Sequence, residues 1–115
     1  MIGIGTDICG IERMKKTKEA FRKKCFTQAE REYAGERSDS LAGIFAAKEA
    51  FVKALGTGFS VFDFHAIEIL HTEAGAPYYH LSGWAREAAE KLGAKNILLS
   101  ISHDNGSAIA FCVIE

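Results

Sequence analysis

One segment, LAGIFAAKEAFVKALGTG at 41–58, constrains the fold of this chain more than any other. On a helical wheel, at about 100° per residue, six large apolar side chains fall on one arc: Leu41, Ile44, Phe45, Phe51, Val52 and Leu55. Asp39 or Ser40 can cap the start of such a helix, and Gly56 or Gly58 can follow its end. The segment therefore predicts one long helix with a buried face.

Three charged residues lie on this predicted helix. Glu49 and Lys53 are four residues apart and share one flank, among alanines that let another group approach closely. Lys48 falls near the middle of the apolar arc, where a lone ammonium is costly to bury without an anionic partner. On spacing alone, a surface ion pair and a lysine that extends to water explain these residues better than a functional site does.

Length and composition indicate one ordinary globular domain, 1–115. The chain has 115 residues, of which 48% are hydrophobic and 25% are charged. No apolar run reaches the roughly 18 residues needed to span a bilayer, so we expect no membrane segment and a cytoplasmic location. The three cysteines are widely spaced and odd in number, which predicts neither a disulfide framework nor a zinc site.

Charge is distributed unevenly along the chain. The net charge of −1 argues against general nucleic-acid binding. Segment 12–24, however, has seven lysines and arginines and two glutamates, a net +5, which leaves −6 for the remainder. Apolar residues within 11–25 are spaced for a thin stripe, so we predict one helix there with a basic face. Such a face is usually only solvated, but it also suits an acidic protein partner.

The N-terminal segment 1–8 alternates and predicts a β-strand. One face carries Ile2, Ile4, Thr6 and Ile8, whereas the other carries Gly3, Gly5 and Asp7. Two interpretations of the bare face stay open. Either a ligand comes close to the glycines and Asp7, or the glycines only admit a neighbouring helix and Asp7 caps the next one.

The remaining segments predict further helices and two β-hairpins. Thr27 and Glu30 form a capping-box pattern that starts a short helix to about Tyr33, and a polar loop follows at 35–40. A loop is predicted at 57–63, and strands at 66–71 and 78–81 form the first hairpin. Ser82 can cap a helix whose Trp84, Ala88 and Leu92 face inward. Strands at 97–102 and 107–114 form the second hairpin around the turn signal Asp104-Asn105-Gly106.

Three segments together resemble one family: GIGTDICGIER at 3–13, FAAKEAFVKALGTG at 45–58 and SISHDNGSAIAFCVIE at 100–115. The chain resembles holo-[acyl-carrier-protein] synthase, the small bacterial type of 4′-phosphopantetheinyl transferase, over nearly its whole length. It departs from the family pattern at Ile44, where the family usually has Arg, at Ala66, where it has Asp, and in the turn at 75–77. These changes affect coenzyme-binding detail and turn chemistry more than the reacting groups.

The resemblance implies transfer of the 4′-phosphopantetheine arm of coenzyme A to a serine of acyl carrier protein, with release of adenosine 3′,5′-bisphosphate, in support of fatty acid biosynthesis. The metal-binding Asp and Glu of the family correspond to Asp7 and Glu49, and Mg²⁺ commonly takes one or two carboxylates with water and substrate phosphates. Lys53 is expected beside the pyrophosphate, where it stabilises or protonates the departing ADP. Glu49 is also expected to orient or deprotonate the serine, directly or through a water.

Other site residues follow from the same resemblance. Lys48, Lys53, Gly56 and His103 are expected to contact the coenzyme, and a phosphate would be the missing anion of Lys48. Ser102-His103-Asp104 is not interpreted as a catalytic triad, since consecutive strand residues alternate faces. The surface that receives acyl carrier protein is expected to comprise Arg13, Phe21, Arg22, Lys23 and Lys24, with Phe21 as its apolar anchor.

The small members of this family are trimers with active sites between subunits. Together with the predicted elements, this implies an α+β fold in which helices pack on a short antiparallel sheet, assembled as a homotrimer. Two other functions stay open. One is a different magnesium-dependent pyrophosphate transferase or hydrolase that uses Asp7 and Glu49, and the other is a non-catalytic adaptor that holds an acidic partner with the basic helix.

Overall fold

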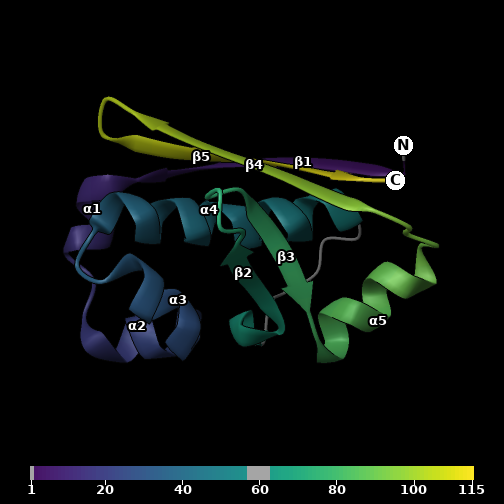
Figure 1. Ribbon diagram of the computed structural model, residues 1–115, viewed down its shortest axis with the longest axis horizontal. Coiled ribbons are helices and arrows are strands. Elements are labelled where there is room, and N and C mark those ends of the chain that lie inside the picture. The colour runs from purple at the N-terminus through teal and green to yellow at the C-terminus, as the bar shows by residue number, and fades with distance from the viewer. Residues whose placement is uncertain (1, 57–62) are drawn as a thin grey trace.

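The computed structural model describes residues 2–56 and 63–115 (Figure 1). The predicted loop at 57–63 therefore lies, apart from Asp63, outside the described residues. In chain order the elements are β1 (Gly3–Gly10), α1 (Ile11–Lys15), α2 (Glu19–Cys25), α3 (Gln28–Ala34), α4 (Ser38–Leu55), the 3₁₀ helix η1 (Phe64–Ala66), β2 (Ile67–His71), β3 (Pro77–Leu81), α5 (Gly83–Lys91), β4 (Ile97–Asp104) and β5 (Ser107–Ile114). The α+β class is confirmed.

The strands form two antiparallel sheets, one of three strands in the order β1-β5-β4 and one hairpin, β2-β3. Both predicted hairpins are thus confirmed. Asn105 and Gly106 have φ angles of 49° and 82°, the positive values that a tight two-residue turn between β4 and β5 requires. At the far end of the sheet the backbone N–H of Ile2 donates to the carbonyl of Ile114 at 2.7 Å, so the two chain ends lie side by side.

Helix α4 is the centre of the molecule. It runs beneath the three-stranded sheet, with the hairpin β2-β3 on its other side, α1 to α3 at one end and α5 at the other (Figure 1). The predicted apolar arc is buried, as Leu41, Ile44 and Phe51 show with at most 2% exposure, except at Phe45, which is partly buried. The helix begins earlier than predicted, after Arg37, because residues 38–40 form its first turn. Gly56 ends it in a left-handed conformation.

Two glycines of β1 allow this strand to lie directly on α4. A Cβ atom at Gly3 would stand 2.0 Å from the carbonyl oxygen of Ala54, and one at Gly5 would stand 2.0 Å from that of Ala50. The bare face of β1 therefore admits a neighbouring helix, which decides between the two interpretations for the glycines. Asp7 does not cap α1, because the N-cap is Gly10 and no side chain bonds there.

The predicted single helix over 11–25 is wrong. Helices α1 and α2 are separated by three residues that include Thr17. The hydroxyl of Thr17 donates to the carbonyl of Met14 at 2.6 Å. The guanidinium of Arg22 donates to the same carbonyl at 3.1 Å and to Thr17 Oγ1 at 3.0 Å. These side-chain bonds replace the helical ones across the break, and the bend lets both Met14 and Cys25 be buried.

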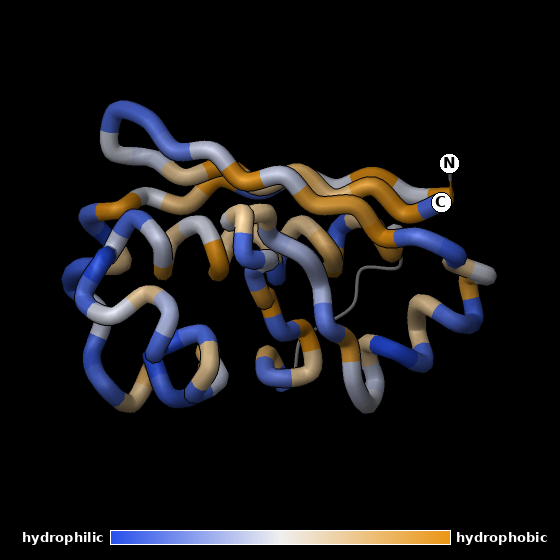
Figure 2. The backbone as a smooth tube through the Cα atoms, in the orientation of Figure 1, coloured by the Kyte–Doolittle hydropathy of each residue, from blue (hydrophilic) through white to orange (hydrophobic). Residues whose placement is uncertain are grey.

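Two shorter helices begin where the sequence predicts. The capping box of α3 is present, because Thr27 Oγ1 accepts from the Glu30 N–H and Glu30 Oε1 accepts from the Thr27 N–H. Helix α5 follows Ser82, but its fully buried residues are Ala85 and Ala89, while the three predicted inward residues are only partly buried. Hydrophobic residues are most continuous along the three-stranded sheet (Figure 2).

Candidate active site

The predicted catalytic residues of β1 and α4 come together where the two elements pack along one another. Asp7 lies on the same inner face of β1 as Gly3 and Gly5, so its side chain is directed toward α4. Lys53 Nζ lies 3.0 Å from Asp7 Oδ1, although 46 positions separate the two residues in sequence. The side chain of Asp7 is 17% exposed and that of Lys53 is 55% exposed. The pair therefore stands at the edge of the protein interior, open to solvent on one side.

Glu49 belongs to the same group of charges. Burial raises the pKa of the Glu49 carboxyl above its ordinary 4.5, the negative charge of Asp7 raises it further, and the charge of Lys53 lowers it. Desolvation and a nearby like charge both disfavour the ionised carboxylate. Two carboxylates and one ammonium thus share this place, and their summed charge favours an additional cation.

The donor set of Asp7 and Glu49 fits a Mg²⁺ ion that keeps part of its water shell. This ion prefers oxygen ligands and is usually held by one or two carboxylates together with substrate phosphates. Within residues 2–56 and 63–115, no group of three or more histidine, cysteine, aspartate or glutamate side chains could enclose a metal. The described residues therefore offer an open, two-carboxylate site rather than a closed cage.

Lys48 does not face this site. Its ammonium is fully buried, lies 2.9 Å from Glu30 Oε1 and donates to the carbonyls of Phe64 and Ile67 at 2.9 and 2.7 Å. The three donors of the ammonium are thereby used within the protein. The expectation that a coenzyme phosphate supplies its anion is therefore wrong, because Glu30 supplies it. The sequence presented Glu30 only as part of a capping box, and nothing in the local pattern links it to Lys48.

His103 lies at the opposite edge of the three-stranded sheet from Asp7, since β1 and β4 flank the central strand β5. Its Nε2 is 3.8 Å from Asp39 Oδ2, and both residues line a pocket of about 180 Å³. Ile44, at the position of the family Arg, also lines this pocket and is 1% exposed. A single chain therefore does not bring His103 to Asp7. Gly56 lies one turn beyond Lys53, and, apart from its chain neighbours, none of the described residues lies within 4 Å of where its Cβ atom would stand.

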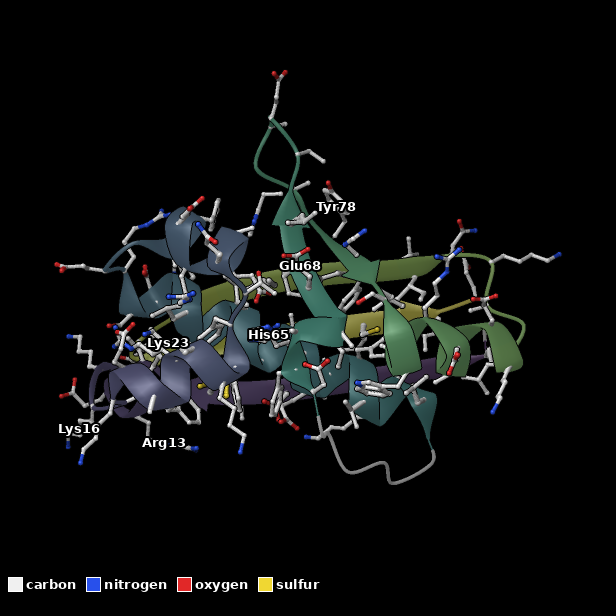
Figure 3. All side chains as sticks on the ribbon, turned by 90° about the horizontal axis from the view of Figure 1, so that it is seen from below. Arg13, Lys16, Lys23, His65, Glu68 and Tyr78 are labelled. Carbon is white, nitrogen blue, oxygen red and sulfur yellow. The ribbon has the colours of Figure 1, made fainter. Side chains whose placement is uncertain are left out.

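The basic residues of α1, α2 and the connection between them lie together at one end of the molecule, as Arg13, Lys16 and Lys23 show (Figure 3). Arg13, Lys23 and Lys24 are exposed. Arg22 is different, because its guanidinium is used to hold the break between α1 and α2.

Phe21 connects the basic end of the molecule to α4. Its ring is 37% exposed and lies 6.0 Å from that of Phe45, which in turn lies 5.7 Å from that of Phe64. Phe45 precedes Glu49 by four residues, about one helical turn. The three rings form an aromatic row, which runs from the basic surface toward the charged group of Asp7, Glu49 and Lys53.

The sequence model described as the 4′-phosphopantetheinyl transferase superfamily matches residues 3–112 of the chain. The chain belongs to this superfamily. Among curated relatives, the transferase is 49% identical to the holo-[acyl-carrier-protein] synthase of Clostridium novyi, with 100% of this chain and 88% of that protein covered. It is 46% identical to the synthase of Thermoanaerobacter sp., with 96% of this chain and 84% of that protein covered.

Solved structures agree with this membership. The synthase of Neisseria meningitidis superposes with a TM-score of 0.88 at 36% identity, covering 100% of this chain and 98% of that one. The Helicobacter pylori synthase, solved in complex with coenzyme A, has a TM-score of 0.85 at 34% identity, and the match covers 97% of this chain and 99% of that one. The resemblance to the small bacterial synthases is confirmed, and the transferase is an enzyme. In the part of the chain that the structure describes, no helix is long and apolar enough to cross a membrane.

Proposed function

We propose that this transferase moves 4′-phosphopantetheine from coenzyme A to a serine of acyl carrier protein and releases adenosine 3′,5′-bisphosphate. The observation that carries the proposal is the proximity of Asp7, Glu49 and Lys53 where β1 packs along α4. Similarity to synthases solved with coenzyme A, from Helicobacter pylori and Bacillus anthracis, supports it. In this role the enzyme provides holo-acyl carrier protein for fatty acid biosynthesis in the cytoplasm.

The chemistry is one phosphoryl-type displacement. The serine oxygen forms a bond to the β-phosphorus, which carries the pantetheine arm, while the bond from that phosphorus to the bridging oxygen breaks and 3′,5′-ADP departs. Glu49 accepts the serine proton, directly or through a water. Lys53 stabilises or protonates the oxygen of the departing ADP.

Asp7 and Glu49 would hold a Mg²⁺ ion, which supplies neutralisation of the charge on the pyrophosphate when it is bound. The two side chains come from elements that the glycines of β1 hold in direct contact, so their separation is set by the core of the protein. This arrangement orients the carboxylates before any substrate arrives.

The basic end of the molecule would receive the carrier protein, which is acidic. Arg13, Lys23 and Lys24 supply positive charge, and Phe21 supplies a partly exposed apolar anchor. Arg22 contributes by holding the shape of this surface, because its donors bind Met14 and Thr17. The aromatic row from Phe21 to Phe45 then leads from the docked carrier toward Glu49.

The outer face of the three-stranded sheet would form the contact between subunits of a homotrimer. This face exposes Ile4, Ile8, Leu98, Ile109 and Phe111, each between 43% and 65%. Leu98, Ile109 and Phe111 also line a depression of about 390 Å³ on β4 and β5. A contiguous exposed apolar patch on a soluble protein usually marks an interface. Because His103 and Asp7 lie at opposite edges of one sheet, assembly would complete each coenzyme site with His103 from a second copy.

Incubation of the enzyme with apo-acyl carrier protein, coenzyme A and MgCl₂ tests the proposal. We expect the carrier to gain the mass of one phosphopantetheine group, with equimolar 3′,5′-ADP, and a carrier whose serine is replaced by alanine to gain nothing. Release of 3′,5′-ADP without modified carrier would instead identify a hydrolase. Carrier binding without any turnover would identify an adaptor.

A further inference from the structure

The ammonium of Lys53 stands where a cation bound to Asp7 would meet it. Lys53 Nζ is 3.0 Å from Asp7 Oδ1, within hydrogen-bond distance. The Asp7 side chain is only 17% exposed, so little of its carboxylate is open to solvent beside the lysine. A divalent ion that takes Asp7 and Glu49 as ligands would place two positive charges next to a third.

We propose that Lys53 is a resident counter-ion of Asp7, which an incoming divalent cation displaces and thereby frees for the diphosphate of the substrate. This inference rests on the proposed function, since it concerns the same two carboxylates. It adds that one lysine serves two anions in turn, a carboxylate before the cation binds and a phosphate afterwards.

The surroundings of Lys53 suit such a movement. Its side chain is 55% exposed and carries the ammonium on a flexible four-carbon stem, so the ammonium can leave Asp7 without exposing core residues. Only the side chain of Lys53 would move. Its neighbours Val52, Ala54 and Leu55 are buried and hold the backbone of α4 in place. The pair is also not needed to join β1 to α4, since the contacts of Gly3 with Ala54 already do so.

The charge balance explains why a counter-ion is present. Without Lys53, the carboxylates of Asp7 and Glu49 would repel one another, since the two charges interact in a half-buried place. With Lys53 on Asp7, that repulsion is reduced, but the affinity for a cation is lowered as well. Removing the lysine should therefore strengthen cation binding, by about tenfold for charges a few ångströms apart near the surface.

The test uses Mn²⁺ alone, with its free concentration followed by electron paramagnetic resonance, and with neither coenzyme A nor carrier protein present. We expect Lys53→Met to bind Mn²⁺ about tenfold more tightly than the unmodified enzyme. Lys53→Arg keeps the positive charge and should bind as weakly as the unmodified enzyme. Lys91→Met, at the exposed end of α5, is the matched control and should leave the affinity unchanged. Asp7→Asn should bind Mn²⁺ most weakly.

Unchanged or weaker Mn²⁺ binding by Lys53→Met, in a variant that melts like the unmodified enzyme, would overturn the inference. Tighter binding by Lys91→Met to the same degree would also overturn it, because the effect would then be one of net charge. The outcome is separable from that of the transfer assay. If Lys53→Met binds Mn²⁺ more tightly but the unmodified enzyme transfers nothing to the carrier, the proposed function fails and the counter-ion role stands.

Discussion

Lys48 Nζ lies 2.9 Å from Glu30 Oε1, and both side chains are fully buried. The second carboxylate oxygen of Glu30 accepts a bond from the backbone N–H of Ile69 at 2.8 Å. The ion pair therefore joins α3, α4 and β2 through groups that are all hydrogen-bonded, as buried charges require. It also anchors the residue directly before Glu49, so the orientation of the candidate base depends on it.

Removing one partner of this pair should destabilise the protein strongly. We expect Lys48→Met and Glu30→Gln each to lower the free energy of unfolding by roughly 3–5 kcal/mol, because each leaves buried polar groups uncompensated. Urea denaturation followed by circular dichroism measures this. Arg86→Met in the exposed pair Arg86–Glu90 is the control and should change stability by about 1 kcal/mol at most. Equal effects of the buried and exposed substitutions would contradict the prediction.

Glu49→Gln should stabilise the metal-free protein at neutral pH. The pKa of Glu49 is raised above 4.5 in the folded state, chiefly by burial, so between 4.5 and the raised value the folded state binds more protons than the unfolded state. The stabilisation from protonation is complete below about pH 4.5 and is lost as the pH rises through the folded pKa.

Thermal melts with a chelator at pH 7 should therefore show a higher midpoint for Glu49→Gln than for the unmodified protein. The difference should shrink as the pH approaches 4.5, the ordinary value for this group. Glu90→Gln, on the exposed side of α5, is the matched control and should leave the midpoint at pH 7 nearly unchanged. A lower midpoint for Glu49→Gln at pH 7 would show that the ionised carboxylate is favoured by its surroundings.

Both proposed metal ligands should be essential for transfer but not for folding. We expect Asp7→Asn and Glu49→Gln each to lower kcat by about 10²-fold or more, the usual effect of removing one preorganised electrostatic group. Lys53→Ala should slow the chemical step measured in a single turnover. Rates are compared over a series of MgCl₂ concentrations, and near-normal turnover of either carboxylate variant at limiting Mg²⁺ would show that the ligand assignment is wrong.

The basic end should determine the affinity for the carrier protein. Lys23→Glu with Lys24→Glu is expected to raise KM for the carrier and to flatten its dependence on salt, because rim charges chiefly steer association. Phe21→Ala should mainly speed dissociation, as loss of a partly buried anchor does.

Arg22 is unsuitable for this test, since its substitution would also disturb the connection of α1 to α2. KM for coenzyme A should stay constant in all these variants, and Lys91→Glu on α5 should leave both constants unchanged. An unaltered KM for the carrier at low salt would rule out this surface as the docking site.

The outer sheet face should hold the subunits together. Phe111→Glu is expected to convert a trimer to monomers in sedimentation experiments and to abolish transfer, whereas Tyr78→Glu, at an equally exposed aromatic of β3, should do neither. Mixing inactive Asp7→Asn and His103→Ala proteins should restore part of the activity if each site uses both copies. A fully active monomer at nanomolar concentration would refute the shared site.

Local patterns determined much of this fold. The apolar arc of 41–58 predicted α4, the Thr27 and Glu30 spacing predicted the cap of α3, and Asn105-Gly106 predicted the turn of the last hairpin. Each depends on residues within a few positions of one another, so the sequence alone was sufficient. The segments that resemble the synthase family likewise brought Asp7, Glu49 and Lys53 into one hypothesis before any contact was known.

Tertiary contacts decided what local patterns left open. Only the packing of α4 on β1 shows that Gly3 and Gly5 serve a helix and leave Ile4 and Ile8 on the outside. Only the approach of α3 to α4 supplies Glu30 as the anion of Lys48, because the two residues belong to different helices. The break within 11–25 likewise depends on Arg22 reaching Met14, eight positions away. Such non-local contacts satisfy buried charges and backbone groups that no periodicity of the sequence encodes.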